Sequence, residues 1–174
     1  MNDKVGKVLF TKEQIEERAR EIGEQIAKDY EGEELYIIGT LRGAVVWMAD
    51  MMKNISNDME IDFIMASSYG SGTTSSGSVK IKKDLEGDIK GKNVIIVEDI
   101  VDTGTTLKFL KDHLAQRKPK SIKICTLLDK PSRRIADISA DYTGFSIDNL
   151  FVIGYGLDYD QKYRNLPYVS YLEG

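Results

Sequence analysis

The sequence has 174 residues, a length typical of one domain with a single core. Its 24 basic and 28 acidic residues give a net charge of −4, which argues against a protein that grips nucleic acid by its phosphates. The single cysteine, Cys125, excludes an intramolecular disulfide and fits a reducing, cytoplasmic location. We expect neither an apolar leader nor a membrane segment. With His113 as the one histidine, a metal would need oxygen ligands.

Helix and strand patterns alternate along the chain. Thr11 and Gln14 form a capping box before apolar residues at helical spacing, which predicts a helix over 12–29. Further helices are expected over 44–52 and 105–116, and strands over 35–38, 61–65, 94–97, 122–128 and 151–153. Alternation of this kind predicts an α/β fold, with a central parallel sheet flanked by helices in one domain over 1–174.

Residues 70–78 contain no side chain larger than threonine, so they cannot bury apolar area and should form a loop. Composition alone favours a tolerated surface insertion. Long loops in compact domains also often serve as active-site lids. Ser68 and Tyr69 at the base would give such a lid a hydroxyl and an amphipathic ring.

Residues 94–107 carry the strongest functional signal. An apolar run, Val-Ile-Ile-Val, is typical of a strand buried on both faces, and it ends in two carboxylates, Glu98 and Asp99. The loop Asp-Thr-Gly-Thr-Thr at 102–106 and a helix start follow, and these suit a phosphate monoester. The carboxylates suit ribose hydroxyls and Mg²⁺. The segment therefore predicts a site for a phosphorylated sugar with a metal, whereas a helix cap beside two solvated acids explains less of it.

Residues 98–106, Glu-Asp-Ile-Val-Asp-Thr-Gly-Thr-Thr, resemble the phosphoribosyl-pyrophosphate motif of the type I phosphoribosyltransferases. Other segments resemble the hypoxanthine/guanine members of that family, and together the matches run from about residue 10 to 172. These segments are 41–43, 68–69, 127–134, 151–159 and 162–167. The resemblance implies a flexible loop over about 69–79 and a small base-binding hood formed by chain ends, mainly 130–174.

The resemblance also implies the reaction and the residue roles. A magnesium-dependent enzyme of purine salvage would transfer 5-phosphoribosyl from phosphoribosyl pyrophosphate to hypoxanthine, and also to guanine, releasing pyrophosphate. Asp102 would be the general base. Expected substrate contacts are Arg42, Gly43 and Arg164 for pyrophosphate, Glu98 and Asp99 for ribose, Thr103, Gly104, Thr105 and Thr106 for the 5′-phosphate, Lys130 for the 6-oxo group, and Phe151 and Val152 for the purine. Glu98, Asp99 and Asp158 would be the metal ligands, and Ser68 and Tyr69 would belong to the lid.

Simpler interpretations stay open for individual residues. Lys130 could be solvated, Phe151 could pack in the core and Asp158 could cap a turn. We expect His113 at the surface and Cys125 as a small buried filler. Tyrosines near the C-terminus suit either the core or a subunit contact, and we expect a homodimer or homotetramer.

Two other functional classes fit the sequence less well. A non-enzymatic regulator of the same fold would show a basic face and a lost catalytic carboxylate, but the net charge is −4 and Asp102 is present. An enzyme for pyrimidine or orotate acceptors fits poorly with Lys130 and the segment 151–158. We therefore expect small-molecule substrates, with no nucleic acid and no membrane as partners.

Overall fold

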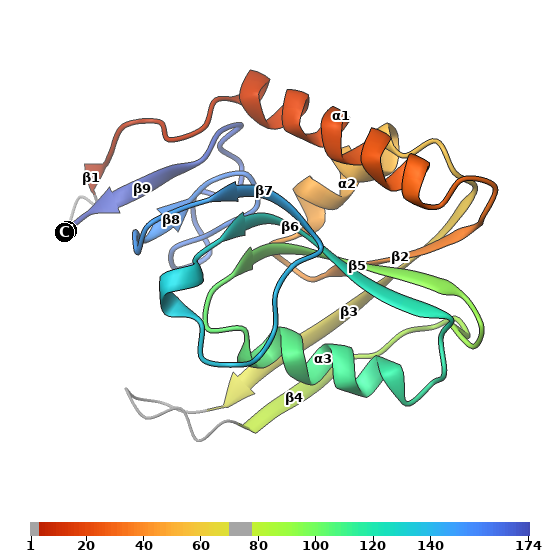
Figure 1. Cartoon of the computed structure of the whole chain (residues 1–174). Coiled ribbons are helices and arrows are strands. Elements are labelled where there is room, and N and C mark those ends of the chain that lie inside the picture. The colour runs from red at the N-terminus through yellow and green to blue at the C-terminus, as the bar shows by residue number, and fades with distance from the viewer. Residues whose placement is uncertain (1–3, 70–77) are drawn as a thin grey trace.

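Six strands form a central sheet, and Figure 1 shows their arrangement. In sheet order they are β4 (Ser78–Lys83), β3 (Met59–Tyr69), β2 (Leu35–Thr40), β5 (Asn93–Val101), β6 (Ser121–Asp129) and β7 (Tyr142–Ser146). The structure, a computed structural model, describes residues 4–69 and 78–174. All neighbouring strands are parallel except β3 and β4, which are antiparallel. The predicted fold class, with its central parallel sheet, is confirmed.

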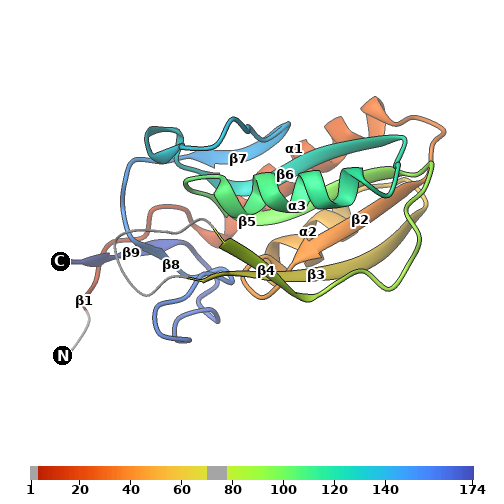
Figure 2. The ribbon, with the colours of Figure 1, turned by 90° about the horizontal axis from the view of Figure 1, so that it is seen from below.

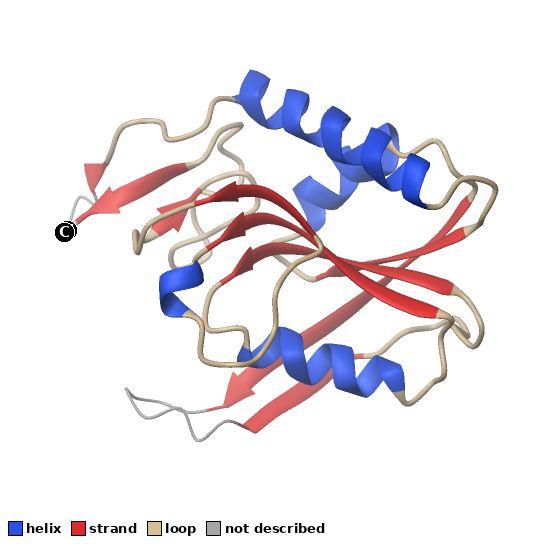
Figure 3. Cartoon of the chain, in the orientation of Figure 1, coloured by secondary structure: helices blue, strands red, loops and turns tan. Residues whose placement is uncertain are grey.

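Helices cover both faces of this sheet (Figure 3). Helices α1 (Lys12–Asp29) and α2 (Val45–Asn54) lie over one face, and α3 (Thr105–Ala115) lies over the other. Successive strand residues point to opposite faces, so Ile95 packs in the core beneath α1 and α2 and Ile96 packs in the core beneath α3. This arrangement explains why the run at 94–97 contains no polar residue.

Helix α1 begins where the capping box predicts. The Thr11 hydroxyl accepts a hydrogen bond from the Gln14 amide at 3.2 Å, and the Gln14 side chain accepts one from the Thr11 amide at 2.8 Å. Two of the free amides of the first turn are thus satisfied locally. The apolar face of α1, including Ile15 and Ile26, is completely buried against the sheet.

The two ends of the chain meet in a second, antiparallel sheet. It contains β1 (Lys4–Val5), β9 (Ser170–Glu173) and β8 (Val152–Ile153), in that order. We call this sheet, together with the connecting residues 154–169, the hood. Figure 2 shows the hood beside the end of the central sheet at which its parallel strands finish. The expected small hood formed by chain ends is therefore present.

Several predicted strand bounds are wrong. Strand β5 does not end at Val97 but continues to Val101, so Glu98 and Asp99 lie inside the strand rather than after it. Strand β5 extends this far because it stays paired with β6: Glu98 opposes Thr126 and Val101 opposes Asp129. Four further strands, β1, β4, β7 and β9, and the short 3₁₀ turn η1 (Pro131–Arg133) were not predicted from the sequence.

The loop between β3 and β4 is shorter than expected. The two strands pair as far as Tyr69 and Ser78, so the segment between them covers 70–77 rather than about 69–79. Those residues lie outside the described part of the chain, and the lid stays a prediction. Ser68 is exposed near the end of β3, at the base of this segment.

A buried carboxylate fixes the connection that leads into β5. Asp62 is only 7% exposed, and its Oδ2 accepts hydrogen bonds from the Tyr36 hydroxyl at 2.7 Å and from the amides of Glu86 and Gly87 at 2.9 and 3.0 Å. Burial alone would raise its pKa, but the hydrogen bonds from Gly87, Tyr36 and other donors prevail and lower the pKa below its ordinary value. Asp62 is therefore held in its charged form.

We predict that Asp62→Asn destabilises the fold by about 2–3 kcal/mol at pH 7, because hydrogen bonds to a buried charge are lost and an amide donor faces amide donors. The folded-state pKa of Asp62 is lowered, so its contribution is complete above the unfolded-state pKa of about 3.9 and is lost as the pH falls through the folded-state pKa. Urea unfolding should therefore show a difference in the free energy of unfolding between the wild type and Asp62→Asn at pH 7, and a smaller difference below pH 4. Asp148→Asn, at an exposed position, is the control; an unchanged midpoint for Asp62→Asn would contradict the assignment.

Candidate active site

The loop after β2 approaches the carboxylates of β5 very closely. It contains a cis peptide bond between Leu41 and Arg42. A Cβ atom added to Gly43 would lie only 1.7 Å from Oδ2 of Asp99, so any other residue would displace this carboxylate. The predicted pyrophosphate residues Arg42 and Gly43 thus lie beside Asp99, at the end of the central sheet where its parallel strands finish.

Glu98 and Asp99 form a pair of adjacent acids at this edge. Oε1 of Glu98 accepts hydrogen bonds from the Thr40 hydroxyl at 2.7 Å and from the Asp99 amide at 3.0 Å. Burial, followed by the neighbouring charge of Asp99, raises the pKa of Glu98 well above its ordinary value. Two acids held this close favour a positive ligand or hydroxyl donors beside them. Thr40, which sequence reasoning did not single out, is the residue that orients Glu98.

Two small cavities open at the same edge. One, of about 120 Å³, is lined mainly by residues 101–107, and the other, of about 220 Å³, by the loop at 40–43 and Asp99. Both cavities are lined by Glu98, Ile100 and Thr106. The predicted phosphate loop and the predicted pyrophosphate loop therefore face neighbouring cavities with Glu98 between them.

The predicted phosphate loop, 102–106, passes directly into the start of α3. Gly104 has φ of +81°, and a Cβ at this position would meet Ile138 Cγ2 at 2.6 Å and Arg134 Cδ at 2.9 Å. Glycine is required here for both reasons. Because α3 begins at Thr105, the first amides of the helix have no partner within it and point toward the loop. This is the arrangement that binds phosphate at helix N-termini.

Asp102 and the loop backbone are held by two consecutive arginines. Nε of Arg133 contacts Oδ1 of Asp102 at 3.0 Å, in a pair whose two side chains are both more than 40% exposed. Nε of Arg134 donates to the carbonyl of Asp102 at 3.2 Å, and Nη1 donates to the carbonyl of Ile138 at 2.8 Å. Arg134 also forms an ion pair with Asp129. Arg134 thereby connects the predicted phosphate loop to the end of β6.

Lys130 is buried beside this loop, with 7% of its surface exposed. Its amide donates to the carbonyl of Val101 at 2.9 Å. Its ammonium group has no hydrogen bond or ion pair with any residue that the structure describes. Burial lowers the pKa of Lys130, and the nearby charge of Asp102 partly opposes this effect. The interpretation of Lys130 as a solvated lysine is therefore wrong.

Two aromatic rings at the hood, Phe151 and Tyr159, are exposed to solvent. Phe151 is 54% exposed, and its ring lies edge-on to Tyr159 with 5.5 Å between the ring centroids. The interpretation of Phe151 as core packing is therefore wrong. Val152, its neighbour, is buried and opposes Tyr171 in the hood sheet. Tyr155 is also buried, which assigns at least one of the C-terminal tyrosines to the core.

Asp158 and Arg164 form an ion pair in the hood. Oδ1 of Asp158 lies 3.1 Å from Nη2 of Arg164, and Oδ2 accepts a hydrogen bond from the Gln161 amide at 2.9 Å. Asp158 therefore does cap a turn, and both of its oxygens have protein partners. Arg164 also donates through Nη1 to the carbonyl of Gly156 at 2.7 Å. A Cβ on Gly156 would lie 2.1 Å from the carbonyl of Gly43, so the hood touches the loop that carries Arg42.

His113 and Cys125 lie outside this site. His113 Nε2 is 3.0 Å from Asp84 Oδ2, in a cluster that also contains Arg117, so His113 is only partly exposed rather than a free surface residue. Cys125 is completely buried, and burial raises the pKa of its thiol to about 12, as suits a small filler. Within residues 4–69 and 78–174, no group of three or more His, Cys, Asp or Glu side chains could hold a metal unaided. No helix in the same ranges is long and apolar enough to cross a membrane.

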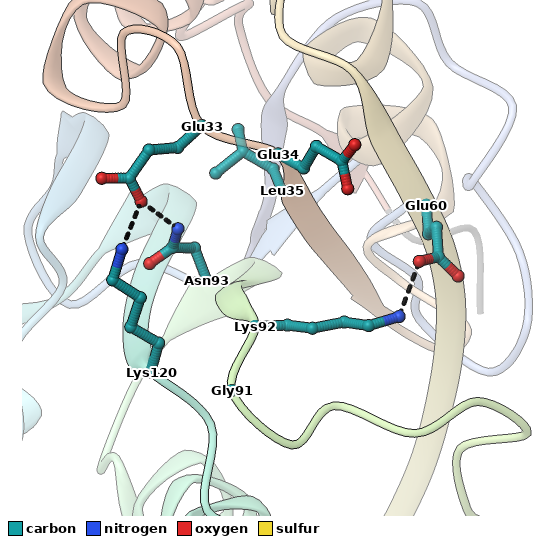
Figure 4. A pocket seen from close by; sticks show the side chains of 8 residues that line it. All are labelled: Glu33, Glu34, Leu35, Glu60, Gly91, Lys92, Asn93 and Lys120. Carbon is teal, nitrogen blue, oxygen red and sulfur yellow. Dashed lines mark hydrogen bonds and ion pairs between the residues drawn. The ribbon is translucent and has the colours of Figure 1, made fainter.

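A further pocket, of about 300 Å³, lies at the opposite end of the sheet (Figure 4). Its lining includes Glu33, which pairs with Lys120 at 3.0 Å, and Lys92, which pairs with Glu60 at 2.6 Å. The basic groups thus satisfy acids of the same pocket. It lies where β2 and β5 begin, away from the carboxyl ends at which ligands of such sheets bind.

Comparison with known proteins places the chain in a family. Residues 7–160 match the phosphoribosyl transferase domain. The hypoxanthine-guanine phosphoribosyltransferase of Streptococcus thermophilus is 50% identical over 169 residues, which are 97% of this chain and 94% of that protein. The hypoxanthine-guanine phosphoribosyltransferase of Streptococcus pneumoniae is 49% identical, with coverage of 99% and 96%. This chain belongs to the hypoxanthine-guanine phosphoribosyltransferase family.

Solved structures agree with this assignment. A crystal structure of a hypoxanthine-guanine phosphoribosyltransferase from Bacillus anthracis matches with a TM-score of 0.93 and 48% identity, over 99% of this chain and 100% of that one. A hypoxanthine phosphoribosyltransferase from Staphylococcus aureus gives a TM-score of 0.94 and 49% identity, over 97% and 92%. The family resemblance drawn from the sequence motifs is thereby confirmed, together with the prediction of a transferase enzyme.

We predict that Arg134→Ala lowers the free energy of unfolding by about 3 kcal/mol, because it leaves Asp129 as an unpaired, largely buried charge. Arg133→Ala is the matched control, since it removes a neighbouring arginine from an exposed ion pair worth at most about 1 kcal/mol. Urea unfolding of the three proteins measures the difference. Equal loss of stability in both variants would contradict the role assigned to Arg134.

Proposed function

We propose that this enzyme transfers the 5-phosphoribosyl group from phosphoribosyl pyrophosphate to hypoxanthine and guanine, in purine salvage. The proposal rests on one observation: the predicted phosphate loop, an acidic pair and a buried Lys130 with no partner among the described residues meet where the parallel strands end. A buried ammonium group without a partner is costly, and a ligand oxygen would relieve that cost. The names of the relatives support the same activity.

The proposed reaction exchanges two bonds at the anomeric carbon of the ribose. The C1′–O bond to pyrophosphate breaks, and its electron pair leaves with the pyrophosphate. A lone pair on a ring nitrogen of the purine forms the new C1′–N bond, and the proton of the purine ring passes to Asp102. The transition state carries positive charge on the ribose ring. The products are inosine or guanosine monophosphate and pyrophosphate.

Each side chain is assigned a role in this exchange. Amides and hydroxyls of 103–106 bind the 5′-phosphate. Glu98 and Asp99 bind the ribose hydroxyls, because both line the cavity beside the loop at 40–43 and Glu98 also lines the cavity beside 101–107. Arg42, Gly43 and Arg164 bind pyrophosphate, and arginine suits this ligand through its planar fork of donors. Lys130 donates to the 6-oxo oxygen of the purine, while the exposed ring of Phe151 stacks on the base and the Val152 backbone reads its edge.

The residues at the site fit Mg²⁺ brought in with the substrate. Mg²⁺ keeps several waters and is usually held by one or two carboxylates plus substrate phosphates, so no all-protein cage is needed. Glu98 and Asp99 offer oxygen ligands at the right edge. Asp158 would have to release Arg164 or the Gln161 amide to act as a ligand. When bound, Mg²⁺ would supply charge neutralisation for the pyrophosphate leaving group.

The cellular setting belongs to the same proposal. We place the enzyme in the cytoplasm, because its one cysteine is free and buried and its substrates are small molecules. We also propose a homodimer or homotetramer. Exposed apolar side chains outside the site, including Val45 and Ile61, which are 45% and 44% exposed, are consistent with a subunit contact.

We predict that activity requires a divalent cation. Excess chelator should abolish nucleotide formation, and Mg²⁺ or Mn²⁺ should restore it, because the leaving group carries a large negative charge. The measurement is the initial rate with phosphoribosyl pyrophosphate and hypoxanthine before and after chelation. Full turnover in excess chelator would overturn the metal assignment.

We predict that substitutions of Asp102 and Lys130 impair different steps: turnover for Asp102 and purine binding for Lys130. Asp102→Asn should lower turnover by roughly 10²–10⁴, the usual value of general-base catalysis, with little change in binding of phosphoribosyl pyrophosphate. Lys130→Ala removes a charged donor worth about 1.5–3 kcal/mol, so purine binding and the preference for 6-oxo over 6-amino acceptors should weaken.

A spectrophotometric assay with hypoxanthine, guanine, xanthine, adenine and orotate in turn measures both effects and tests the proposed function. The wild-type enzyme should use hypoxanthine and guanine. An orotate-specific enzyme would refute the function. An unchanged 6-oxo preference in Lys130→Ala would refute the assignment of Lys130 alone.

A further inference from the structure

The side chain of Gln161 joins two arginines that come from distant parts of the chain. Its Oε1 accepts a hydrogen bond from Nη1 of Arg42 at 3.0 Å and another from Nη2 of Arg164 at 3.2 Å. Arg42 follows strand β2 of the central sheet, whereas Arg164 lies in the hood. One amide oxygen therefore holds both guanidinium groups at the junction of the two parts.

The backbone around Gln161 adopts a conformation that costs energy. Asp160, Gln161 and Tyr163 have φ of +49°, +64° and +75°, in the left-handed region that residues other than glycine seldom occupy. Local bonds hold the turn: Tyr159 and Lys162 exchange amide-to-carbonyl hydrogen bonds at 3.1 and 3.0 Å. Residues kept in such regions by their surroundings are often found at ligand sites. The turn places the Gln161 amide on Asp158 and its side chain between the arginines.

The chemistry of an amide suits this position. Two guanidinium groups repel one another, so a neighbouring acceptor must bring them together. The Gln161 side chain is neutral and leaves the charge of Arg42 available to an anion, whereas Arg164 is already paired with Asp158. A carboxylate in the same place would compete with that anion. The arrangement is thus suited to a ligand with several negative charges.

We propose that Gln161 is a positioning residue, which holds Arg42 and Arg164 together so that both guanidinium groups bind the same pyrophosphate. This inference rests on the proposed function, which assigns the two arginines to pyrophosphate. It adds that the hood and the loop after β2 form one anion site only while Gln161 joins them.

Gln161→Asn is the sharpest test. Asparagine tolerates the left-handed conformation, so the turn is kept, but its side chain is one methylene shorter and cannot reach both arginines. Affinity for pyrophosphate in the presence of Mg²⁺, measured by titration calorimetry, should fall about fivefold to tenfold, as expected for loss of about one hydrogen bond. The KM for phosphoribosyl pyrophosphate should rise by a similar factor, while the KM for hypoxanthine and the melting temperature stay unchanged.

Asn165→Ala is the matched control, because it removes an exposed amide side chain of the same segment that makes no hydrogen bond within the described residues. It should bind pyrophosphate as the wild type does. Wild-type affinity in Gln161→Asn would overturn the role of Gln161 and leave the proposed function intact. An equal loss for pyrophosphate and hypoxanthine, with a lower melting temperature, would show a merely structural role and also overturn it. If the wild-type enzyme itself failed to bind pyrophosphate, the assignment of the arginines in the proposed function would fail as well.

Discussion

The pairing of β5 with β6 is the constraint on which the candidate site depends. The two parallel strands remain in register up to the pair of Val101 and Asp129, four residues beyond the last apolar residue of the central run. Lys130 then donates its amide to the carbonyl of Val101, which brings it beside the phosphate loop. A shorter β5 would leave Glu98 and Asp99 in a loop and Lys130 without its anchor.

Charge balance at the carboxyl ends of the parallel strands explains why buried charged side chains are tolerated there. Arg134, which holds the loop at 102–106 in place, pairs with Asp129. Lys130, by contrast, has no such partner within the described residues, and the acidic pair faces a cavity. The groups left unsatisfied are those for which the proposed substrates supply the complementary charge. This distinction separates the site from the pocket at the far end of the sheet, where both lysines pair with glutamates.

The parts of the fold that depend on local sequence could be predicted from it. Helix α1 has its capping box and apolar spacing within 11–29, and its bounds match. Strand β4, Ser-Val-Lys-Ile-Lys-Lys, is polar because it lies at the sheet edge, and only its pairing with β3 makes it a strand. The same applies to β9, which depends on the distant β1 and β8.

In the candidate site, too, some features could be predicted from contiguous sequence and others depend on the folded structure. The motif at 98–106 is contiguous, so its residue types alone indicate a phosphate loop beside carboxylates. The roles of Arg134 and Gln161 could not be predicted, because each depends on a partner that is distant in sequence: Asp102 for Arg134 and Arg42 for Gln161. Burial resolved what residue type could not: Phe151 is exposed although it is apolar, and Lys130 is buried although it is charged.

The central claim is that the sheet edge and the hood bind one nucleotide between them. A crystal structure of the enzyme with inosine monophosphate tests this claim most directly. The account predicts the 5′-phosphate on the amides of 103–106, the ribose hydroxyls beside Glu98 and Asp99, and the 6-oxo oxygen within hydrogen-bond distance of the Lys130 ammonium group. A phosphate bound elsewhere, or a purine that does not contact Lys130, would contradict it.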